Sequence, residues 1–399
     1  MQRILTVSNN ISKKTTETEF EYIIRVCSNK DFLNLSWNEI KEILNTELCY
    51  NYSQDRYRKI YYKYLDNSVE ELKDSKSSNI QNLIELQKEK VKIRDERTQI
   101  NALIRRTARE ETIKELAISI AKEFDNKLLL KSPDKIDITN EVVEKHGILC
   151  LSDWHYGIEV NNIFNCYNVD IAKDRVISLK NKVIDIIKKE KLKEITIVNL
   201  GDLIAGKIHL QLRINSQIDV ITQIIEVSEI LTQFIYELTK KVKINYTSVI
   251  DNHSRLDPNK KEALQLESLA RITDWYIKDR LKDNLNFTYL DCSNSYGEDI
   301  SVFSIFDFTL AAVHGDKDKQ KTILNKLCAF TQLHLDAVLS AHMHHFSVDE
   351  SNETELFCNG SLMGTDDYAH ELRLNSNPSQ TLLVATPDNI SSVIYKIKL

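Results

Sequence analysis

The hydrophobic pattern of the chain changes near residue 146. Beyond that point, short apolar runs of strand length alternate with stretches in which apolar residues recur every three or four positions. The run Ile148–Leu151 is followed at once by the polar segment 152–155. We therefore expect a buried parallel strand that ends in a polar loop, which is where open α/β sheets carry their chemistry.

The same pattern, an apolar run that ends in metal-binding or acid–base side chains, occurs five times. The residues at these ends are Asp153 with His155, Gly201 with Asp202, Asn252 with His253, His314 with Asp316, and His342 with His344. Helical periodicity fills the segments 168–194 and 216–241 between the first three runs. The carboxyl ends of parallel strands in a doubly wound sheet share one edge, so we expect all five ends to converge on one cleft.

Converging carboxylates, imidazoles and an amide oxygen predict a metal site. His345 is expected to point away from it, and His209 either faces the cleft or is a loop residue without a role. From residue 356 onward the alternation predicts antiparallel strands that complete a second sheet packed on the first. Within this tail a substrate wall is one interpretation of Asn359, Gly360, Ser361, Tyr368 and Arg373.

Residues 1–70 predict a small all-α domain. Ser36 and Glu39 have the spacing of a capping box, and a further helix begins near Ser53. Two short helices with a tight connection are consistent with a helix-turn-helix. The second helix carries basic residues that we expect to contact nucleic acid: Arg56, Arg58, Lys59 and Lys63. The alternative is a helical bundle that docks on another protein, with its tyrosines packed inside.

The segment 71–130 predicts a long helical spacer. It is rich in Glu, Lys, Arg and Gln, it contains neither Gly nor Pro, and its apolar positions keep helical spacing with gaps. Such a spacer separates two domains and is also compatible with a homodimer. Residues 131–146, around Pro133, are expected to be the linker to an α/β domain at 147–399.

The charge balance gives no general sign of a nucleic-acid-binding protein. The 399 residues carry a net charge of -6 at pH 7, so such a partner would need a local basic patch. The seven cysteines are scattered without a C-x-x-C pair, which indicates reduced thiols. We see no leader pattern and no apolar stretch of about 18 residues. We therefore expect a cytoplasmic protein that does not enter a membrane.

The order of the motifs resembles that of the calcineurin-like metallophosphoesterases. The family signature runs D-x-H, G-D, G-N-H, an H beside G or D, and G-H-x-H. This chain has DWH at 153–155, GD at 201–202, NH at 252–253, HGD at 314–316 and HMH at 342–344. Asp251 and Ala341 stand where the signature has glycine, so the departures affect backbone positions of the loops and leave every ligand position matched. The resemblance runs from Gly147 onward and implies a four-layer α-β-β-α sandwich.

The resemblance also implies two divalent metal ions and their ligands. One ion would be held by Asp153, His155, Asp202 and His344, and the other by Asp202, Asn252, His314 and His342. His253 would stand outside both sets, near the leaving group, as a catalytic proton donor. Mixed nitrogen and oxygen ligation favours Mn, with Fe or Zn as alternatives, over Mg or Ca.

The leading hypothesis is a two-metal phosphodiesterase that acts as a DNA exonuclease or endonuclease. The layout looks like metallophosphoesterases encoded by bacteriophages, which would place the protein in the host cytoplasm. The second part looks similar to nuclease subunits of double-strand-break repair complexes, so a partner ATPase is conceivable. One alternative is a phosphatase or nucleotide phosphodiesterase whose front module recognises protein. Another is a DNA-binding scaffold with a structural metal site, against which the non-ligand His253 argues.

Overall fold

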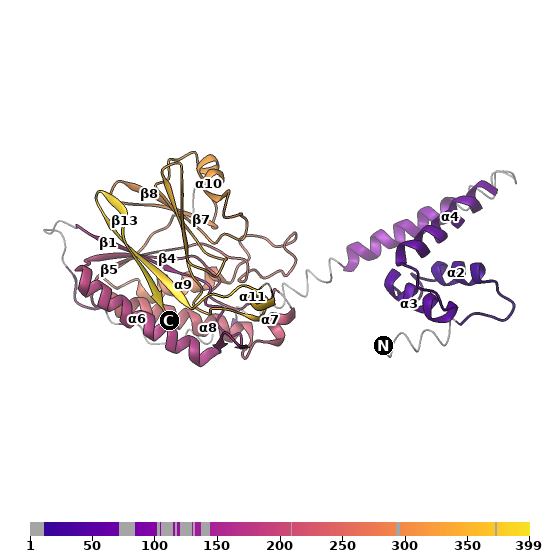
Figure 1. The fold of residues 1–399 in the computed structure, drawn as a ribbon, viewed down its shortest axis with the longest axis horizontal. Helices are drawn as coiled ribbons and strands as arrows, with labels where there is room; N and C mark the ends of the chain where they lie inside the picture. The colour runs from indigo at the N-terminus through magenta and orange to yellow at the C-terminus, as the bar shows by residue number, and fades with distance from the viewer. Residues whose placement is uncertain are drawn as a thin grey trace. The chain divides into compact units, whose positions relative to one another are not determined.

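The computed structural model describes residues 12–71, 84–101, 104, 115, 118–119, 130, 132–136, 144–208, 210–292, 296–371 and 373–399. The chain divides into two units, Met1–Thr112 and Ile113–Leu399 (Figure 1). Each unit has its own hydrophobic core. Much of the predicted spacer and half of the predicted linker lie outside the described residues, although residues 84–101 are helical and exposed.

Within the described part of the smaller unit, the core is formed by α2 (Glu19–Ser28), α3 (Trp37–Leu48) and α4 (Gln54–Glu71). Ser36 and Glu39 form the predicted capping box at the start of α3, and α4 starts directly after Ser53. Tyr57 of α4 is fully buried in a core with Ile40 and Leu44. The unit is therefore held together by apolar packing among three short helices.

Six strands form the first sheet of the larger unit, in the order β13-β12-β1-β4-β5-β6. The strands β1 (His146–Leu151), β4 (Glu194–Asn199), β5 (Lys243–Ser248) and β6 (Phe287–Tyr289) are parallel neighbours. The strands β12 (Ser379–Thr386) and β13 (Asn389–Lys398) are antiparallel and join at β1. The helices α6 (Val169–Glu190), α8 (Val220–Thr239) and α9 (Ala270–Leu281) connect the parallel strands.

Five strands form the second sheet, in the order β10-β11-β9-β8-β7. They are β7 (Ile300–Ile305), β8 (Phe308–Val313), β9 (Ala337–Ser340), β10 (Ser347–Ser351) and β11 (Thr354–Cys358). Within this sheet, β8, β9 and β11 are parallel neighbours. Short elements complete the unit: β2 (Val160–Asn161), β3 (Cys166–Tyr167), α7 (Leu210–Ile214), α10 (Ile323–Thr331) and α11 (Asp367–Glu371).

The alternation of side chains along the strands separates the packing faces. Leu149 and Leu151 of β1 pack with α6, α8 and α9, whereas Ile148 and Cys150 pack against the second sheet. The opposite face of the second sheet packs against α10, for example through Leu327. Figure 1 shows α6, α8 and α9 along one side of the first sheet and α10 beyond the second sheet. The predicted mixed α/β architecture with a helical N-terminal part is confirmed.

Two features of the predicted sheet are wrong. The five polar strand ends do not belong to one sheet, because β1, β4 and β5 lie in the first and β8 and β9 in the second. The tail was expected in the second sheet, but only β11 joins it, while β12 and β13 extend the first sheet beside β1. Alternating hydrophobicity shows that one face of a strand is buried, and it does not show which edge the strand joins.

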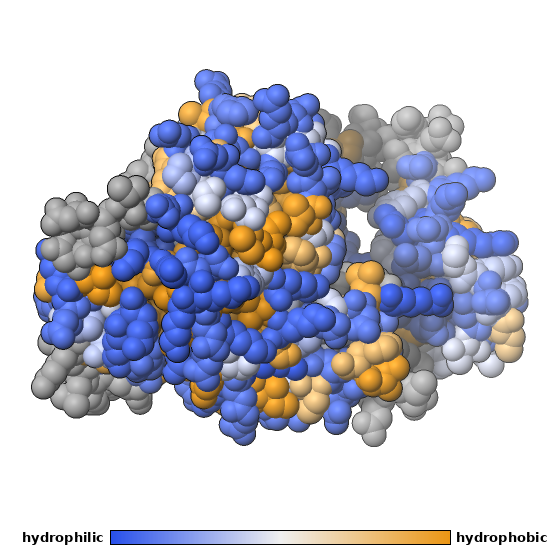
Figure 2. Space-filling view, turned by 60° about the vertical axis from the view of Figure 1, so that its left-hand side comes forward, coloured by the Kyte–Doolittle hydropathy of each residue, from blue (hydrophilic) through white to orange (hydrophobic). Residues whose placement is uncertain are grey.

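The surface is mainly hydrophilic on the face drawn in Figure 2, with hydrophobic patches between the charged groups. That distribution agrees with a chain in which 28% of the residues are charged. Among the described residues, no helix is long and apolar enough to cross a membrane.

Candidate metal centre

The predicted ligands stand on an unusual backbone at the strand ends. Five of them adopt a positive φ: Asp153 (52°), His155 (45°), Asp202 (53°), His342 (69°) and His344 (58°). This conformation is unfavourable for residues other than glycine and clusters at functional sites, where the surrounding structure maintains it. The strained loops that follow β1, β4 and β9 thus present carboxylates and imidazoles to a common space.

The first group of possible ligands joins the β1 loop to the β9 loop. Nε2 of His344 lies 3.4 Å from Oδ1 of Asp153, and Nε2 of His155 lies 3.9 Å from the same oxygen. The two imidazole nitrogens are 3.0 Å apart. Three ligand-type atoms within this range have the spacing of a set that surrounds one cation.

The second group joins the β4, β8 and β9 loops. Oδ2 of Asp202 lies 3.1 Å from Nε2 of His314, and His342 completes the group. Nε2 of His155 is 3.9 Å from this Asp202 oxygen, so Asp202 stands between the two groups. The expected ligands therefore come together, although they arrive from two sheets.

Unsatisfied buried atoms test whether a cation fits. Among the described residues, five atoms of the predicted ligands are buried without a hydrogen-bond partner: Oδ1 of Asp153, Oδ2 of Asp202, Oδ1 of Asn252, Nε2 of His314 and Nδ1 of His342. Buried polar groups are normally paired because an unpaired one costs about 1–3 kcal/mol. Oxygen and nitrogen lone pairs without partners match what a divalent ion requires, so the donor set fits two such ions.

Backbone carbonyls fix two of the imidazole tautomers. Nδ1 of His314 lies 2.7 Å from the carbonyl oxygen of Leu200, and Nδ1 of His253 lies 2.8 Å from that of Ala205. A carbonyl only accepts, so each Nδ1 carries the hydrogen and the neutral ring keeps its lone pair at Nε2. In both rings that Nε2 faces Oδ2 of Asp202, at 3.1 Å for His314 and 3.8 Å for His253.

His253 has two compatible roles in this geometry. It was predicted to stand outside the ligand sets, yet its Nε2 atom groups with His155 and Asp202 at ligand spacing. Its backbone N–H donates to Oδ1 of Asp202 at 3.2 Å, which ties the loop after β5 to the loop after β4. His253 thus lies beside His155 and Asp202. Its role as a proton donor stays a prediction.

The titration of the cluster follows its charges. Burial opposes ionisation of Asp202, but the neighbouring His253 and His314 hold its pKa well below the usual value. Burial likewise opposes protonation of His314, and the Asp202 carboxylate outweighs it and raises the pKa of His314 to about 10. For His155 burial prevails, with His253 adding to it, and its pKa falls well below the usual value. The buried carboxylates thus attract positive charge to this space.

A hydrogen-bonded layer beneath the site supports Asp153. Its Oδ2 accepts from Ser152 Oγ at 2.7 Å, and Asn359 Nδ2 donates to that hydroxyl at 2.9 Å. Ser361 Oγ donates to the Asp153 carbonyl at 2.9 Å. The expected substrate wall is therefore wrong for Asn359, Gly360 and Ser361, which are buried. Asn359 and Ser361 support Asp153 instead. Their polarity was visible in the sequence, but their burial was not.

Asp251 and Ala341 stand where the signature that the chain resembles has glycine, and neither needs a strained backbone. Neither Asp251 nor Ala341 is among the described residues with positive φ. The Asp251 carboxylate accepts from the backbone N–H and the hydroxyl of Ser254, at 2.7 and 2.9 Å. Burial and the charge of Asp202 raise the pKa of Asp251 to about 7. The altered loop thus retains Asn252 and His253 at the site.

The predicted nucleic-acid contacts lie on α4 in the smaller unit, and all are exposed: Arg56, Arg58, Lys59 and Lys63. The Arg56 guanidinium lies 3.7 Å from the ring centre of Tyr52, and Arg58 is 3.9 Å from the carboxylate of Asp55. Elsewhere, His345 is exposed as expected, and His209 lies outside the described residues.

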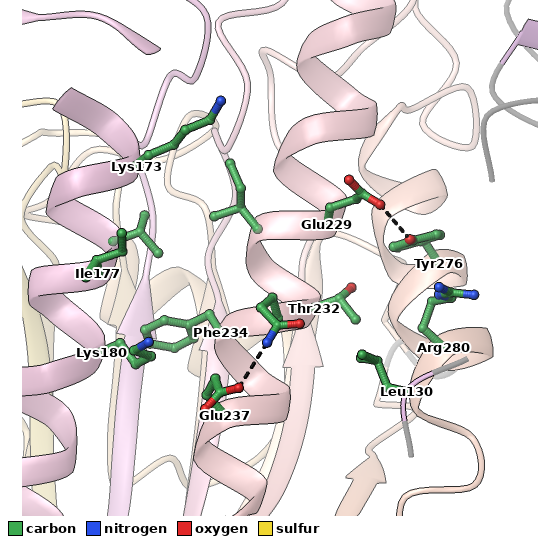
Figure 3. Close-up of a pocket in the computed structure, with 13 residues that line it drawn as sticks. Leu130, Lys173, Ile177, Lys180, Glu229, Thr232, Phe234, Glu237, Tyr276 and Arg280 are labelled. Carbon is green, nitrogen blue, oxygen red and sulfur yellow. Dashed lines mark hydrogen bonds between the residues drawn. The ribbon is translucent and has the colours of Figure 1, made fainter. Parts of the chain in front are cut away.

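A separate groove of about 470 Å³ lies between α6, α8 and α9. Figure 3 shows Ile177 of α6 and Phe234 of α8 in it, and Glu229 of α8 turned toward Tyr276 of α9. None of the predicted ligands lines this groove. It is therefore not part of the metal centre.

The chain is similar to known proteins in both of its parts. Residues 7–78 match the family model described as YonJ N-terminal domain. The chain is 28% identical over 381 residues to the SPbeta prophage-derived uncharacterized protein YonJ of Bacillus subtilis (strain 168), covering 91% of this chain and 92% of that protein.

Solved structures also align with the chain. A novel archaeal phosphodiesterase aligns at 15% identity and a TM-score of 0.34, covering 63% of this chain and 99% of that one. The phosphoesterase YfcE from E. coli aligns at 14% identity and 0.31, covering 63% and 100%. Vps29 from Entamoeba histolytica, complexed with zinc, aligns at 13% identity and 0.30, covering 63% and 98%.

Proposed function

We propose that the larger unit is a two-metal phosphoesterase that hydrolyses phosphodiester bonds. The observation that carries this proposal is the set of five buried ligand atoms without hydrogen-bond partners among the described residues, which belong to five different loops. Their donor types match a pair of transition-metal ions, with Mn preferred and Fe or Zn as alternatives.

Two ligand sets are proposed on this basis. Asp153, His155, Asp202 and His344 would hold one ion, and Asp202, Asn252, His314 and His342 would hold the other. The Asp202 carboxylate stands between the two groups of histidines, which supports a bridging role. Two divalent ions bound there would supply Lewis acidity to activate a water as nucleophile and to polarise the phosphate.

His253 is proposed to hold the proton that the leaving oxygen needs. Its Nδ1–H is committed to the Ala205 carbonyl, so proton exchange is confined to Nε2. That atom faces the site, and the His253 side chain is 14% exposed. A partly exposed imidazole can donate at Nε2 to a departing oxygen and regain a proton from solvent.

DNA is the proposed substrate, cleaved as an exonuclease or endonuclease. The exposed basic residues of α4 support it, because a phosphate backbone is met by Arg and Lys side chains on a helix. The prophage origin of the YonJ relative supports a phage setting and a place in the host cytoplasm. A homodimer and a partner ATPase remain proposals of the same kind.

The test is release of label from linear single- and double-stranded DNA by purified protein with Mn, beside an Asp202→Asn variant. Degradation that is lost in the variant is the expected result. Intact DNA with Asp202-dependent hydrolysis of a small phosphodiester would keep the metal chemistry and replace DNA by a nucleotide or phosphoprotein substrate. Hydrolysis unaffected by Asp202→Asn would contradict the proposed site.

A further inference from the structure

The tip of the β2–β3 hairpin holds an aromatic side chain out of the core. Oδ1 of Asn162 accepts from the backbone N–H groups of Phe164 and Asn165, both at 3.0 Å, which fixes a tight turn. Phe164 is 51% exposed. An exposed aromatic on a rigid turn is available to a ligand without a cost of ordering.

This tip is tied to the metal centre by two successive hydrogen bonds. Nδ2 of Asn165 donates to the carbonyl of Met363 at 2.8 Å, and the backbone N–H of Met363 donates to the carbonyl of Asp153 at 3.2 Å. Nδ2 of Asn165 also donates to the carbonyl of Thr365 at 3.0 Å. Phe164 therefore directly precedes Asn165, which is linked through Met363 to the backbone of Asp153, a predicted metal ligand.

A second aromatic ring stands beside Phe164. The imidazole of His370 on α11 lies 5.6 Å from the Phe164 ring, centre to centre, with 60° between the planes. Nδ2 of Asn162 donates to Oδ1 of Asp367 at 3.1 Å, which holds α11 against the hairpin tip. His370 is exposed, and so is Arg373, whose backbone N–H donates to the His370 carbonyl at 3.0 Å.

We infer that Phe164 and His370 form a stacking platform for an unpaired nucleobase of a single strand whose scissile phosphodiester lies at the metal centre. The inference deepens the proposed function and rests on it. Every base has a π-face, so two adjacent exposed rings bind single-stranded nucleic acid without reading its sequence. Arg373, exposed beside His370, would meet a phosphate of the same strand.

Two acidic residues beside the platform, Asp366 and Asp367, accept hydrogen bonds from neighbouring groups. Oδ1 of Asp366 accepts from the backbone N–H of Ala369 at 2.7 Å, and Asp367 accepts from Asn162. Both lie at the N-terminus of α11 and form part of the scaffold that orients His370. A duplex keeps its bases paired and stacked, so the platform favours a single strand or a frayed end.

The test uses a single-stranded oligonucleotide that contains 2-aminopurine, whose fluorescence falls when the base stacks. Binding is measured with the full chain in EDTA, so that hydrolysis does not interfere. We expect quenching with the wild type and about tenfold to a hundredfold weaker binding in Phe164→Ala, with Phe164→Trp retaining it. Phe330→Ala is the matched control, because Phe330 is also exposed (61%) but lies on α10.

An activity measurement separates this inference from the proposed function. With Mn, Phe164→Ala should lose about tenfold on a base-bearing strand and little on a strand with abasic residues near the cut. Equal losses on both strands, or quenching in Phe164→Ala that matches the wild type, would overturn the platform. If quenching depends on Phe164 but hydrolysis is unchanged in Asp202→Asn, the proposed metal site would be wrong and the stacking platform would still be supported.

Discussion

Oδ2 of Asp202 and Nε2 of His314 lie 3.1 Å apart in the interior, and neither atom has a hydrogen-bond partner among the described residues. The distance suits a hydrogen bond, but in the neutral imidazole the Nε2 lone pair would face the carboxylate, because Nδ1–H donates to the Leu200 carbonyl. Two acceptors that face each other need a positive charge between or beside them. A proton on His314 supplies it in the free protein, and a cation would supply it in the loaded protein.

Replacement of Asp202 tests that argument directly. In Asp202→Asn the negative charge that both proposed ligand sets share is lost while the shape of the side chain is kept. We expect phosphodiester hydrolysis to fall by at least about a hundredfold, because both proposed ligand sets lose a member. Added Mn should raise the melting temperature of the wild type and do so much less in the variant, because only the native state offers the site. An undiminished Mn-dependent shift in Asp202→Asn would contradict the bridging role.

His253→Gln distinguishes a proton donor from a ligand. If His253 acts on the leaving group, hydrolysis should fall by about a hundredfold to ten-thousandfold while the Mn-dependent melting shift persists. The comparison is His155→Gln, which removes a proposed ligand and should lower both. Loss of the metal shift in His253→Gln would instead assign this residue to the cluster with His155 and Asp202.

The sequence predicted those features that depend on residues close together in the chain. The capping box of Ser36 and Glu39 depends on residues three apart, and the helix it predicts begins at Trp37 as expected. Each polar strand end likewise follows its own apolar run. The division of those strands between two sheets depends instead on partners such as β12, which pairs His146 with Ala385 far along the chain. No local pattern contains that information.

The support of the site was also beyond the reach of the sequence. Ser152, Asn359 and Ser361 orient Asp153, yet as isolated polar residues they resemble surface positions. The left-handed backbone of Asp153 was equally hidden, since aspartate gives only a weak preference for it. Burial and strain are set by tertiary packing, and they became visible only in the folded chain.

Gly206 should be intolerant of any side chain. Its φ is +71°, and a Cβ there would lie 2.2 Å from the carbonyl oxygen of His253. Gly206→Ala should therefore cost about 1–3 kcal/mol in the free energy of unfolding and displace His253, which lowers hydrolysis by more than tenfold. Gly147→Ala is the control, because its Cβ would meet only side-chain atoms of Ile195 and Leu192. Chemical denaturation and initial rates of both variants check the prediction, and equal effects on activity would contradict it.

His146 should make the fold sensitive to acid. It is buried in β1 with its Nε2 atom 2.8 Å from the Thr196 hydroxyl, and burial lowers its pKa from 6.5 to about 4, although Glu194 opposes the shift. The unfolded chain thus binds a proton below about pH 6.5 that the folded chain takes up only near pH 4. Stability is therefore fully present above about pH 6.5, where His146 is neutral in both states. Up to about 3 kcal/mol of the free energy of unfolding is lost as the pH falls from about 6.5 to about 4.

Denaturation of the wild type and His146→Gln between pH 7 and pH 4 measures this contribution. Glutamine keeps a polar contact to Thr196 but does not titrate, so the decline of the unfolding free energy with acid should be shallower in the variant. Parallel curves for the two proteins would assign the acid sensitivity to other groups, for example the carboxylates of the metal centre.

The exposed basic face of α4 should govern binding of DNA. Alanine at Arg56, Arg58 and Lys59 leaves the helical core intact, because Tyr57 supplies the buried contact of this stretch. We expect weaker binding to a duplex probe and a slope of log affinity against log salt that is smaller by about 2 to 3, since each lost phosphate contact releases one counterion fewer. Alanine at Lys188, Lys240 and Lys282, which are exposed in the larger unit, removes the same charge and should leave the slope unchanged. A slope that falls equally in both triple variants would reflect overall charge alone. Equal slopes for the wild type and the α4 variant would contradict the DNA contact and favour the alternative of a protein partner for α4.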